Sequence, residues 1–282
     1  MNNDELMELV RKAVSEAVDK NKGNKCCVSD GEVEDISAYS LRDEFNIPNP
    51  YNKAEYMRIK AKTDARLGVW RSGPRPLTRT TLRVRADNAA AMDAVFNDVG
   101  QEYLDRNNLK TYSTKCGSKE EYLTRPDLGR IFDDETAAQI KKDCINEPDI
   151  QIVVSDGLSS SAVEANIDTV LPAILNGLKT TGLKVGTPFF VKYGRVGAED
   201  SIAKILGAKV TVILLGERPG LATSSSLSAY CVYGGYPGIP EANRTVVSNI
   251  HSHGTPAAEA GAYIAELCQE MFKKKASGLD LK

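Results

Sequence analysis

Polar side chains that could bind a ligand follow several apolar runs in the second half of the chain, where those runs end. Four such segments stand out: Ser155-Asp156-Gly157, Gly194-Arg195-Val196, Glu217-Arg218-Pro219-Gly220 and Ser248-Asn249-Ile250-His251. If each run is a strand of an open α/β sheet, its carboxyl end lies at the edge where such sheets bind ligands. We therefore expect the four segments to lie together and to form a binding site at that edge.

Sequence fingerprints of nucleotide-binding or catalytic sites do not occur at these strand ends. No GxGxxG follows the first strand, and no P-loop pattern is present. The serines of SDGLSSS stand at a helix start, where they could hold an anion, although a plain N-cap is the favoured interpretation. The two histidines, His251 and His253, could share a metal, but the sequence suggests no third ligand and a turn is favoured. We predict no catalytic residue and no metal site in this chain, which favours a cofactor-binding or accessory subunit.

Alternating strands and helices from about residue 150 are expected to position these segments. Apolar runs predict strands at 151–157, 186–195, 209–218, 228–235 and 244–251. Helical periodicity predicts helices at 159–182, 199–207 and 256–275. Ser161 and Glu164 have the spacing of a capping box at the start of the first helix. The predicted fold is α/β, with a mostly parallel Rossmann-like sheet and flanking helices over residues 149–282.

The first half of the chain is predicted to be mainly helical. Residues 3–20 form an amphipathic helix by period, and a flexible linker follows, so that 1–45 make an N-terminal helix and linker. That helix either packs on its own domain or docks onto a partner. Helices are also predicted at 57–69 and 87–106, within a smaller domain at 46–148. Between them, residues 70–85 carry five arginines, and their prolines exclude a helix at the start of the segment.

Composition excludes several classes of partner. The net charge of −2, from 36 basic and 38 acidic residues, gives no electrostatic reason to bind nucleic acid or a membrane. Six cysteines are scattered without CxxC spacing, which favours reduced thiols over a disulfide framework or a zinc site. No apolar run reaches the roughly 18 residues of a transmembrane helix. We expect a cytoplasmic globular protein.

Six stretches of the chain, in matching order and spacing over about residues 60–282, together resemble the small (light) subunit of ethanolamine ammonia-lyase. Residues 1–45 resemble that family only in type, as a helix followed by a variable linker. The six stretches are GVWRSGPRPLTRTTLRVRADNAAAMDAVF, VSDGLSSSAVEAN, LKVGTPFFVKYGRV, VILLGERPGLATSSSLSAY, NRTVVSNIHSHGTP and KKKASGLDLK.

The resemblance implies a subunit of an adenosylcobalamin-dependent lyase that converts ethanolamine to acetaldehyde and ammonia. In that family a large subunit, built on a TIM barrel, holds the substrate and the catalytic residues. The small subunit helps to bind and enclose the cofactor from the other side. The implied assembly is a hetero-oligomer with six copies of each chain.

The resemblance also implies which residues contact cobalamin. Val196 matches the valine of the GRV turn, Glu217 matches the glutamate of GERPG, and Val246 stands where the family can have cysteine. That departure suggests a contact through backbone or shape rather than through a thiol. Arg195 and Gly194 adjoin Val196 and are further candidates. The DxHxxG pattern is missing, which favours cobalamin that keeps its own benzimidazole on cobalt.

Two alternatives remain open at the level of sequence. A stand-alone nucleotide-binding oxidoreductase could use the same sheet, although the missing glycine fingerprint weighs against it. The N-terminal helix resembles short helices that direct enzymes into bacterial microcompartments, which implies a location inside a microcompartment and a contact with its shell. The other interpretation of this helix is an ordinary terminal helix.

Overall fold

The computed structural model describes residues 35–63, 65–221 and 223–281. The predicted N-terminal helix at 3–20 lies outside these residues. Residues 40–282 belong to one compact unit, and the 3-10 helix η1 (Ile36–Ala38) belongs to another. No helix in the described ranges has the length and apolar character needed to cross a membrane.

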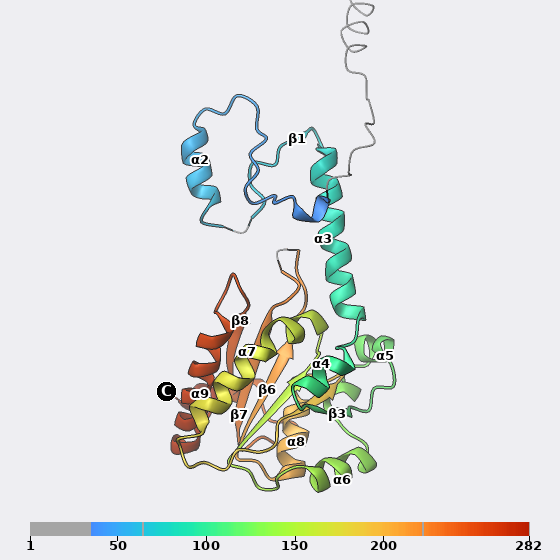
Figure 1. Ribbon diagram of the computed structural model, residues 1–282, viewed down its shortest axis with the longest axis vertical. Helices are drawn as coiled ribbons and strands as arrows, with labels where there is room; N and C mark the ends of the chain where they lie inside the picture. Colours follow the sequence, from blue (N-terminus) through green and yellow to red (C-terminus); the bar gives the residue numbers. More distant parts are fainter. Residues whose placement is uncertain (1–34, 64, 222, 282) are drawn as a thin grey trace, which may run out of the picture. The chain divides into compact units, whose positions relative to one another are not determined.

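One six-stranded sheet forms the centre of the larger unit (Figure 1). Its strands lie in the order β3-β5-β4-β6-β7-β8. The pairings of β3 with β5, β5 with β4 and β4 with β6 are parallel, whereas β7 is antiparallel to both β6 and β8. The predicted α/β class is therefore confirmed, with a mixed sheet. The strands are β3 (Lys110–Ser113), β4 (Ile150–Ser155), β5 (Phe189–Lys192), β6 (Val210–Gly216), β7 (Leu227–Tyr233) and β8 (Thr245–Ile250).

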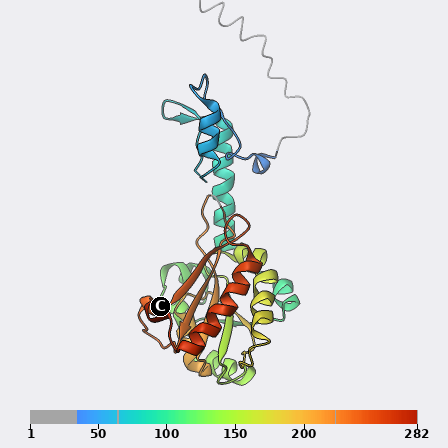
Figure 2. The same ribbon diagram turned by 90° about the vertical axis from the view of Figure 1, so that its left-hand side faces the viewer.

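Helices cover both faces of this sheet (Figures 1 and 2). Helices α7 (Ser160–Leu178) and α9 (Ala257–Lys274) pack side by side on one face over the larger apolar core. Helices α6 (Asp134–Asp143) and α8 (Ala198–Leu206) enclose a second core on the other face. A Cβ at Gly261 would lie 2.8 Å from the carbonyl oxygen of Val170, so glycine permits the close approach of α9 to α7.

Strand β8 is less covered than the other strands of the sheet. Val247 packs against the larger core, on the side of α9. Val246, whose side chain faces the opposite way because side chains alternate along a strand, is 46% exposed. The face of β8 that carries Val246 therefore keeps an apolar side chain in contact with solvent.

The first half of the unit departs from the predicted helices in two places. Helix α2 (Lys53–Lys60) ends well before the predicted limit at residue 69. The buried ammonium of Lys60 donates hydrogen bonds to the carbonyl oxygens of Leu41, Glu44 and Leu67. A continued helix would place residue 67 about 10 Å further along its axis, out of reach of this ammonium. The prediction of a helix over 57–69 was therefore wrong beyond Lys60.

The predicted helix at 87–106 is two helices. Helix α3 (Thr78–Phe96) ends where Asn97 becomes extended, and α4 (Gln101–Arg106) begins after an extended Gly100. The Gly100 amide donates to Glu164 on α7 at 3.1 Å, a tertiary contact that a continuous helix would not allow. The start of the arginine-rich segment is non-helical, as predicted: β1 (Arg71–Ser72) and β2 (Arg75–Pro76) form a small antiparallel pair.

Strand β3 was not predicted, and it joins the sheet from the N-terminal side of the expected domain limit at 148–149. Its four residues are too few for a periodic signal, but they pair with β5 along their whole length. Helix α5 (Lys119–Thr124) and helix α6 follow in the same segment. The sheet thus includes one edge strand from the part of the chain predicted to be mainly helical.

Candidate functional site

The carboxyl ends of β4 and β5 lie at a topological switch point of the sheet. Strand β4 leads into α7 on one face and β5 leads into α8 on the other, which is where open α/β sheets usually bind ligands. Asp156 accepts a hydrogen bond from the Tyr193 amide at 2.8 Å, and Ser155 Oγ accepts one from the Gly194 amide at 3.1 Å. The first two predicted segments therefore lie together, but the polar groups of the first one bind the second.

Asp156, which accepts the hydrogen bond from the Tyr193 amide, is buried. Its side chain is 1% exposed, and the ammonium of Lys119 lies 3.4 Å from Oδ2. Burial raises the pKa of the Asp156 carboxyl, and the positive charge of Lys119 opposes that shift. The pair closes the inside of the switch point, so we assign it a structural role rather than a ligand contact.

Gly194 and Arg195 are also engaged by their own chain. A Cβ at Gly194 would lie 2.5 Å from Ser155 Oγ, so only glycine fits there without a shift. The Arg195 guanidinium lies 4.1 Å from the centroid of the Tyr122 ring and donates to the Tyr122 carbonyl oxygen at 2.7 Å. Its buried Nε has no hydrogen-bond partner among the described residues.

The predicted residues Glu217 and Val246 are joined by Tyr230, which the sequence analysis missed. The Tyr230 hydroxyl donates to Glu217 Oε1 at 2.7 Å, and Tyr230 lies directly opposite Val246 in the pairing of β7 with β8. Val196 and Tyr230 pack against the same core, on the α8 side of the sheet. The structure thus brings all three principal residues to one face of the sheet.

Tyr230 orients the carboxylate of Glu217. Burial raises the pKa of the phenol, and the hydrogen bond to Glu217 raises it further, so the hydroxyl remains a donor at neutral pH. Sequence gave no reason to single out this residue, because a tyrosine in the middle of a strand is usually part of the core. Its alternation with Ala229 and Cys231, both in the larger core, was the available signal that its ring lies on the other face.

A pocket of about 360 Å³, lined mostly by residues with polar side chains, opens beside Glu217, at the ends of β6 and β8 and the start of β7. It brings the third and fourth predicted segments together, as expected. The residues that line it are Glu217, Arg218, Gly220, Thr223, Ser226, Ser228, Ser248 and Asn249. Gly216 directly precedes Glu217 at the end of β6. Its α-carbon is so close to the neighbouring loop after β4 that a Cβ would lie 2.2 Å from the carbonyl oxygen of Ser159.

The serines after β4 form a plain N-cap, which was the favoured interpretation. Ser159 Oγ accepts a hydrogen bond from the Ala162 amide at 3.1 Å and donates to the carbonyl oxygen of Ser224 at 2.5 Å. The predicted capping box was wrong, because the helix begins two residues earlier than the box requires. Ser161 donates to Ser224 instead, and Glu164 accepts from Gly100.

The histidines lie in a turn between β8 and α9, as favoured. The His253 amide donates to His251 Nδ1 at 3.2 Å, which is a local contact within that turn. Within the described part of the chain, no three His, Cys, Asp or Glu residues are grouped in a way that could hold a metal ion.

A buried ion cluster connects the segments that carry Val196 and Val246. Arg244, which directly precedes β8, binds Glu199 through Nε at 2.7 Å and Asp200 through Nη2, both in the first turn of α8. Burial raises the pKa of both carboxyls, that of Asp200 to about 6, and Arg244 opposes the shift. The cluster therefore fixes the start of β8 against the start of α8.

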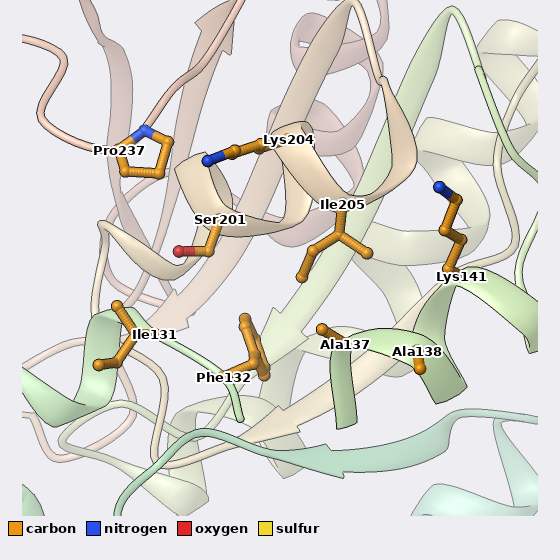
Figure 3. Close-up of a pocket in the computed structure, with 9 residues that line it drawn as sticks. All are labelled: Ile131, Phe132, Ala137, Ala138, Lys141, Ser201, Lys204, Ile205 and Pro237. Carbon is orange, nitrogen blue, oxygen red and sulfur yellow. The ribbon is translucent and has the colours of Figure 1, made fainter. Parts of the chain in front are cut away.

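A second pocket, of about 430 Å³, lies between α6 and α8 (Figure 3). Phe132 and Ile205 form much of its apolar lining, and Lys141 and Lys204 lie at its border (Figure 3). None of the predicted site residues lines it. Its polar side chains are Lys141, Ser201 and Lys204, whereas seven of the eight residues that line the pocket beside Glu217 have polar or charged side chains. The pocket beside Glu217, which also contains predicted site residues, is therefore the better candidate.

Comparison with known proteins gives the family. The family model for "ethanolamine ammonia-lyase light chain (EutC)" matches residues 53–282. Three similar relatives are each named ethanolamine ammonia-lyase small subunit. The relative from Fusobacterium nucleatum subsp. nucleatum is 50% identical, over 99% of this chain and 98% of its own length. That from Clostridium tetani is 54% identical, over 90% and 86%, and that from Listeria monocytogenes is 46% identical, over 100% of both chains.

All three relatives bear the name of a lyase subunit, so they give no support to the alternative prediction of a nucleotide-binding oxidoreductase. The match spans the sheet, both helical layers and every predicted contact residue. The resemblance seen in the sequence motifs is thereby confirmed. This chain belongs to the ethanolamine ammonia-lyase light-chain family.

Proposed function

We propose that this chain is the small subunit of an adenosylcobalamin-dependent ethanolamine ammonia-lyase, which converts ethanolamine to acetaldehyde and ammonia. The observation that carries the proposal is the similarity, over nearly the whole chain, to proteins named as that subunit. A small subunit implies a large-subunit partner, on which we expect the catalytic residues. We further propose an assembly with six copies of each chain.

The residues on the α8 face suit a cobalamin. A corrin presents an apolar ring and a periphery of amides, so it needs apolar contact and hydrogen-bond acceptors. Val246 offers an exposed apolar surface and Val196 a partly buried one. Glu217 offers a carboxylate, with one oxygen held by Tyr230 and the other able to accept from an amide N–H. Arg195 and Gly194, which adjoin Val196 after β5, are further candidate contacts.

This chain's own residues would bind and orient the cofactor and exclude water from it. When bound, adenosylcobalamin supplies radical chemistry through homolysis of its cobalt–carbon bond. Tyr230 would keep the Glu217 carboxylate in one orientation, so that less freedom is lost when a ligand amide binds. We propose that the cofactor keeps its own benzimidazole on cobalt, since the sequence has no DxHxxG pattern.

Reconstitution tests the division of labour between the subunits. The purified chain alone should not deaminate ethanolamine, and addition of the large subunit and adenosylcobalamin should restore acetaldehyde formation. Deamination by this chain alone, or by the large subunit alone at the full rate, would contradict the proposal.

Binding measurements on the reconstituted complex test the site. Glu217→Gln removes the charged acceptor and should weaken cobalamin binding about 10-fold, as expected for a lost hydrogen bond to a charged group. Val246→Asp places a carboxylate against the proposed apolar contact and should weaken binding further. The matched control is Tyr263→Asp, because Tyr263 is similarly exposed, at 55%, but lies on α9. Equal cobalamin affinity in all variants would remove these residues from the site.

We also propose that residues 149–282 are a Rossmann-like cobalamin-contacting domain, preceded by a smaller, mainly helical domain at 46–148. The β4–α7–β5–α8–β6 connections, with helices on alternate faces, support the first part. Strand β3 belongs to the first part and is an edge strand of this sheet, so both parts contribute strands to one sheet.

A microcompartment location is proposed for the enzyme, with the segment at 3–20, outside the described residues, as the contact with the shell. Deletion of residues 1–20 should leave ethanolamine deamination intact and prevent encapsulation in cells that form shells. A reporter fused to this segment that stays diffuse in such cells would contradict the proposal.

A further inference from the structure

Helix α3 packs against its own chain along the face that carries Thr80, Asp87 and Ala94. Thr80 and Ala94 are buried, and the Asp87 side chain, which binds Arg66, is 13% exposed. These three positions are seven residues apart, close to two turns of a helix, so they share one face. The Ala94 carbonyl oxygen accepts a hydrogen bond from Ser160 on α7, which fixes this face against the sheet domain.

The opposite face of α3 carries an exposed stripe that is mainly apolar. Leu82, Met92 and Phe96 are 47%, 54% and 52% exposed, and Arg85 and Ala89 are exposed between them. Three of these positions follow the packed positions by two residues, which is about 200° around the helix axis. The spacing i, i+3, i+7, i+10 and i+14 is that of the seam along which one helix packs against another in a coiled coil. The stripe therefore predicts a helical partner.

The residues of this face match themselves when their order is reversed. Ala89 lies at the centre, with Leu82 seven residues before it and Phe96 seven residues after it. Arg85 and the exposed Asp93 lie four residues to either side of the same centre. An antiparallel second copy, related by a two-fold axis beside Ala89, would bring Leu82 opposite Phe96 and Arg85 level with Asp93. A two-fold axis requires a surface of this self-matching kind.

The charges on this face also fit a second copy. Neither Arg85 nor Asp93 has an ion-pair partner among the described residues. An apolar partner surface would cover the guanidinium of Arg85 without compensating its charge, which is costly. Asp93 of a second copy supplies the carboxylate, and ion pairs beside a helical seam set the orientation of the two helices.

The stripe is separate from the candidate cofactor site. Arg66, which binds Asp87 on the packed face of α3, also donates to the carbonyl oxygen of Leu221 at 2.9 Å. Leu221 belongs to the loop that follows Glu217, so it is the packed face of α3 that adjoins this loop. The apolar stripe lies on the other side of the helix.

We propose that α3 pairs in antiparallel orientation with α3 of a second copy of this chain, through the exposed stripe and Asp93. The stripe from Leu82 to Phe96 is about 21 Å long, so the pair is smaller than a standard protein interface. It is weak for the free chain and stronger in the oligomer, where other contacts hold the copies close together. The proposed assembly with six copies of this chain accommodates three such pairs, and the pairing does not depend on cobalamin.

Cysteine cross-linking tests the pair in the complex with the large subunit. Cys26→Ser and Cys27→Ser remove the two cysteines outside the described residues, and the other four are buried. In this background Ala89→Cys should form a disulfide between two copies on oxidation by dissolved oxygen, seen without reductant as a band of twice the chain mass. Ala258→Cys, at an exposed position on α9, is the control and should give no such band.

Charge reversal tests the register with the full chain in solution. Arg85→Glu alone, or Asp93→Arg alone, places like charges level with each other and should weaken self-association about 10-fold in sedimentation equilibrium at low salt. The chain with both changes restores opposite charges and should regain most of the association. Arg106→Glu, an exposed position on α4, is the control and should have no effect. Circular dichroism checks that each variant is folded.

Three results would overturn the proposal. The first is a complex in which Ala89→Cys gives no cross-linked pair of this chain. The second is a double charge variant that associates no better than the single ones. The third is a disulfide from Ala89→Cys to the large subunit, which would assign the stripe to that chain. Cobalamin affinity of the complex is measured in parallel: if it is retained while the pairing fails, the proposed function stands.

Discussion

Replacement of Arg244 by methionine should lower the free energy of unfolding of the full chain by about 3–5 kcal/mol. The Arg244 side chain is 2% exposed, and its two closest carboxylate partners are equally hidden: Glu199 is 0% exposed and Asp200 is 5% exposed. Methionine fills a similar volume without a charge. Two carboxyl groups would then remain in the interior without their counter-ion.

The magnitude follows from that burial. Removal of one partner from a buried ion pair is far more costly than the pair's net contribution, because the remaining charge stays desolvated. Protonation limits the loss: burial already raises the pKa of both carboxyls, and without Arg244 they would take up protons more readily. By contrast, Arg106 and Asp168 form an exposed pair, at 65% and 48% exposure, for which about 0–1 kcal/mol is expected.

Urea unfolding of the full chain, followed by circular dichroism, measures these differences. Arg244→Met is compared with Arg106→Met as the matched control, at neutral pH and equal salt concentration. A third variant combines Arg244→Met with Glu199→Gln and Asp200→Asn. It should regain much of the lost stability, because no charged group remains buried.

Two results would refute this reasoning. One is a loss of under about 1 kcal/mol for Arg244→Met, the same as for the exposed control. The other is a combined variant no more stable than Arg244→Met alone, which would show that the lost stability came from packing and not from unpaired charge.

Three other outcomes are expected. Gly216→Ala should strongly destabilise the chain, because the added Cβ would lie 2.2 Å from a backbone carbonyl oxygen. Gly100→Ala is the control, since the nearest atom to its added Cβ is a side-chain oxygen at 3.7 Å. The melting temperatures of the two variants test this difference. The folded-state pKa of Asp200, about 6, exceeds its ordinary value of 3.8, so the folded chain binds more protons between these pH values. The stability of the unmodified chain relative to Asp200→Asn should therefore fall as pH rises from about 4 to 6, and urea titrations that show a constant difference would contradict this. In a Cys26→Ser, Cys27→Ser chain, the remaining buried cysteines should react with a thiol reagent only after denaturation, and rapid reaction of the native chain would be the contrary result.

Local patterns were enough to predict much of the second half of the chain. Each strand and helix predicted after residue 150 is present, with boundaries shifted by a few residues. The long apolar run at β6 and the periodic apolar positions of α7 are signals carried by neighbouring residues, so they do not depend on distant parts of the chain. The same applies to the turn that holds His251 and His253.

Contacts between distant residues decided the features that the sequence did not predict. Helix α2 ends at Lys60 because its ammonium binds carbonyl groups of two other segments, and β3 is a strand because β5 pairs with it. The candidate site also depends on contacts between residues that are distant in the sequence. Four strand ends could be expected at one edge of a sheet from their order, but only the pairing of β7 with β8 places Tyr230 between Glu217 and Val246. A hydrogen bond between residues on two strands produces no periodic pattern in the sequence, so only the tertiary structure could reveal it.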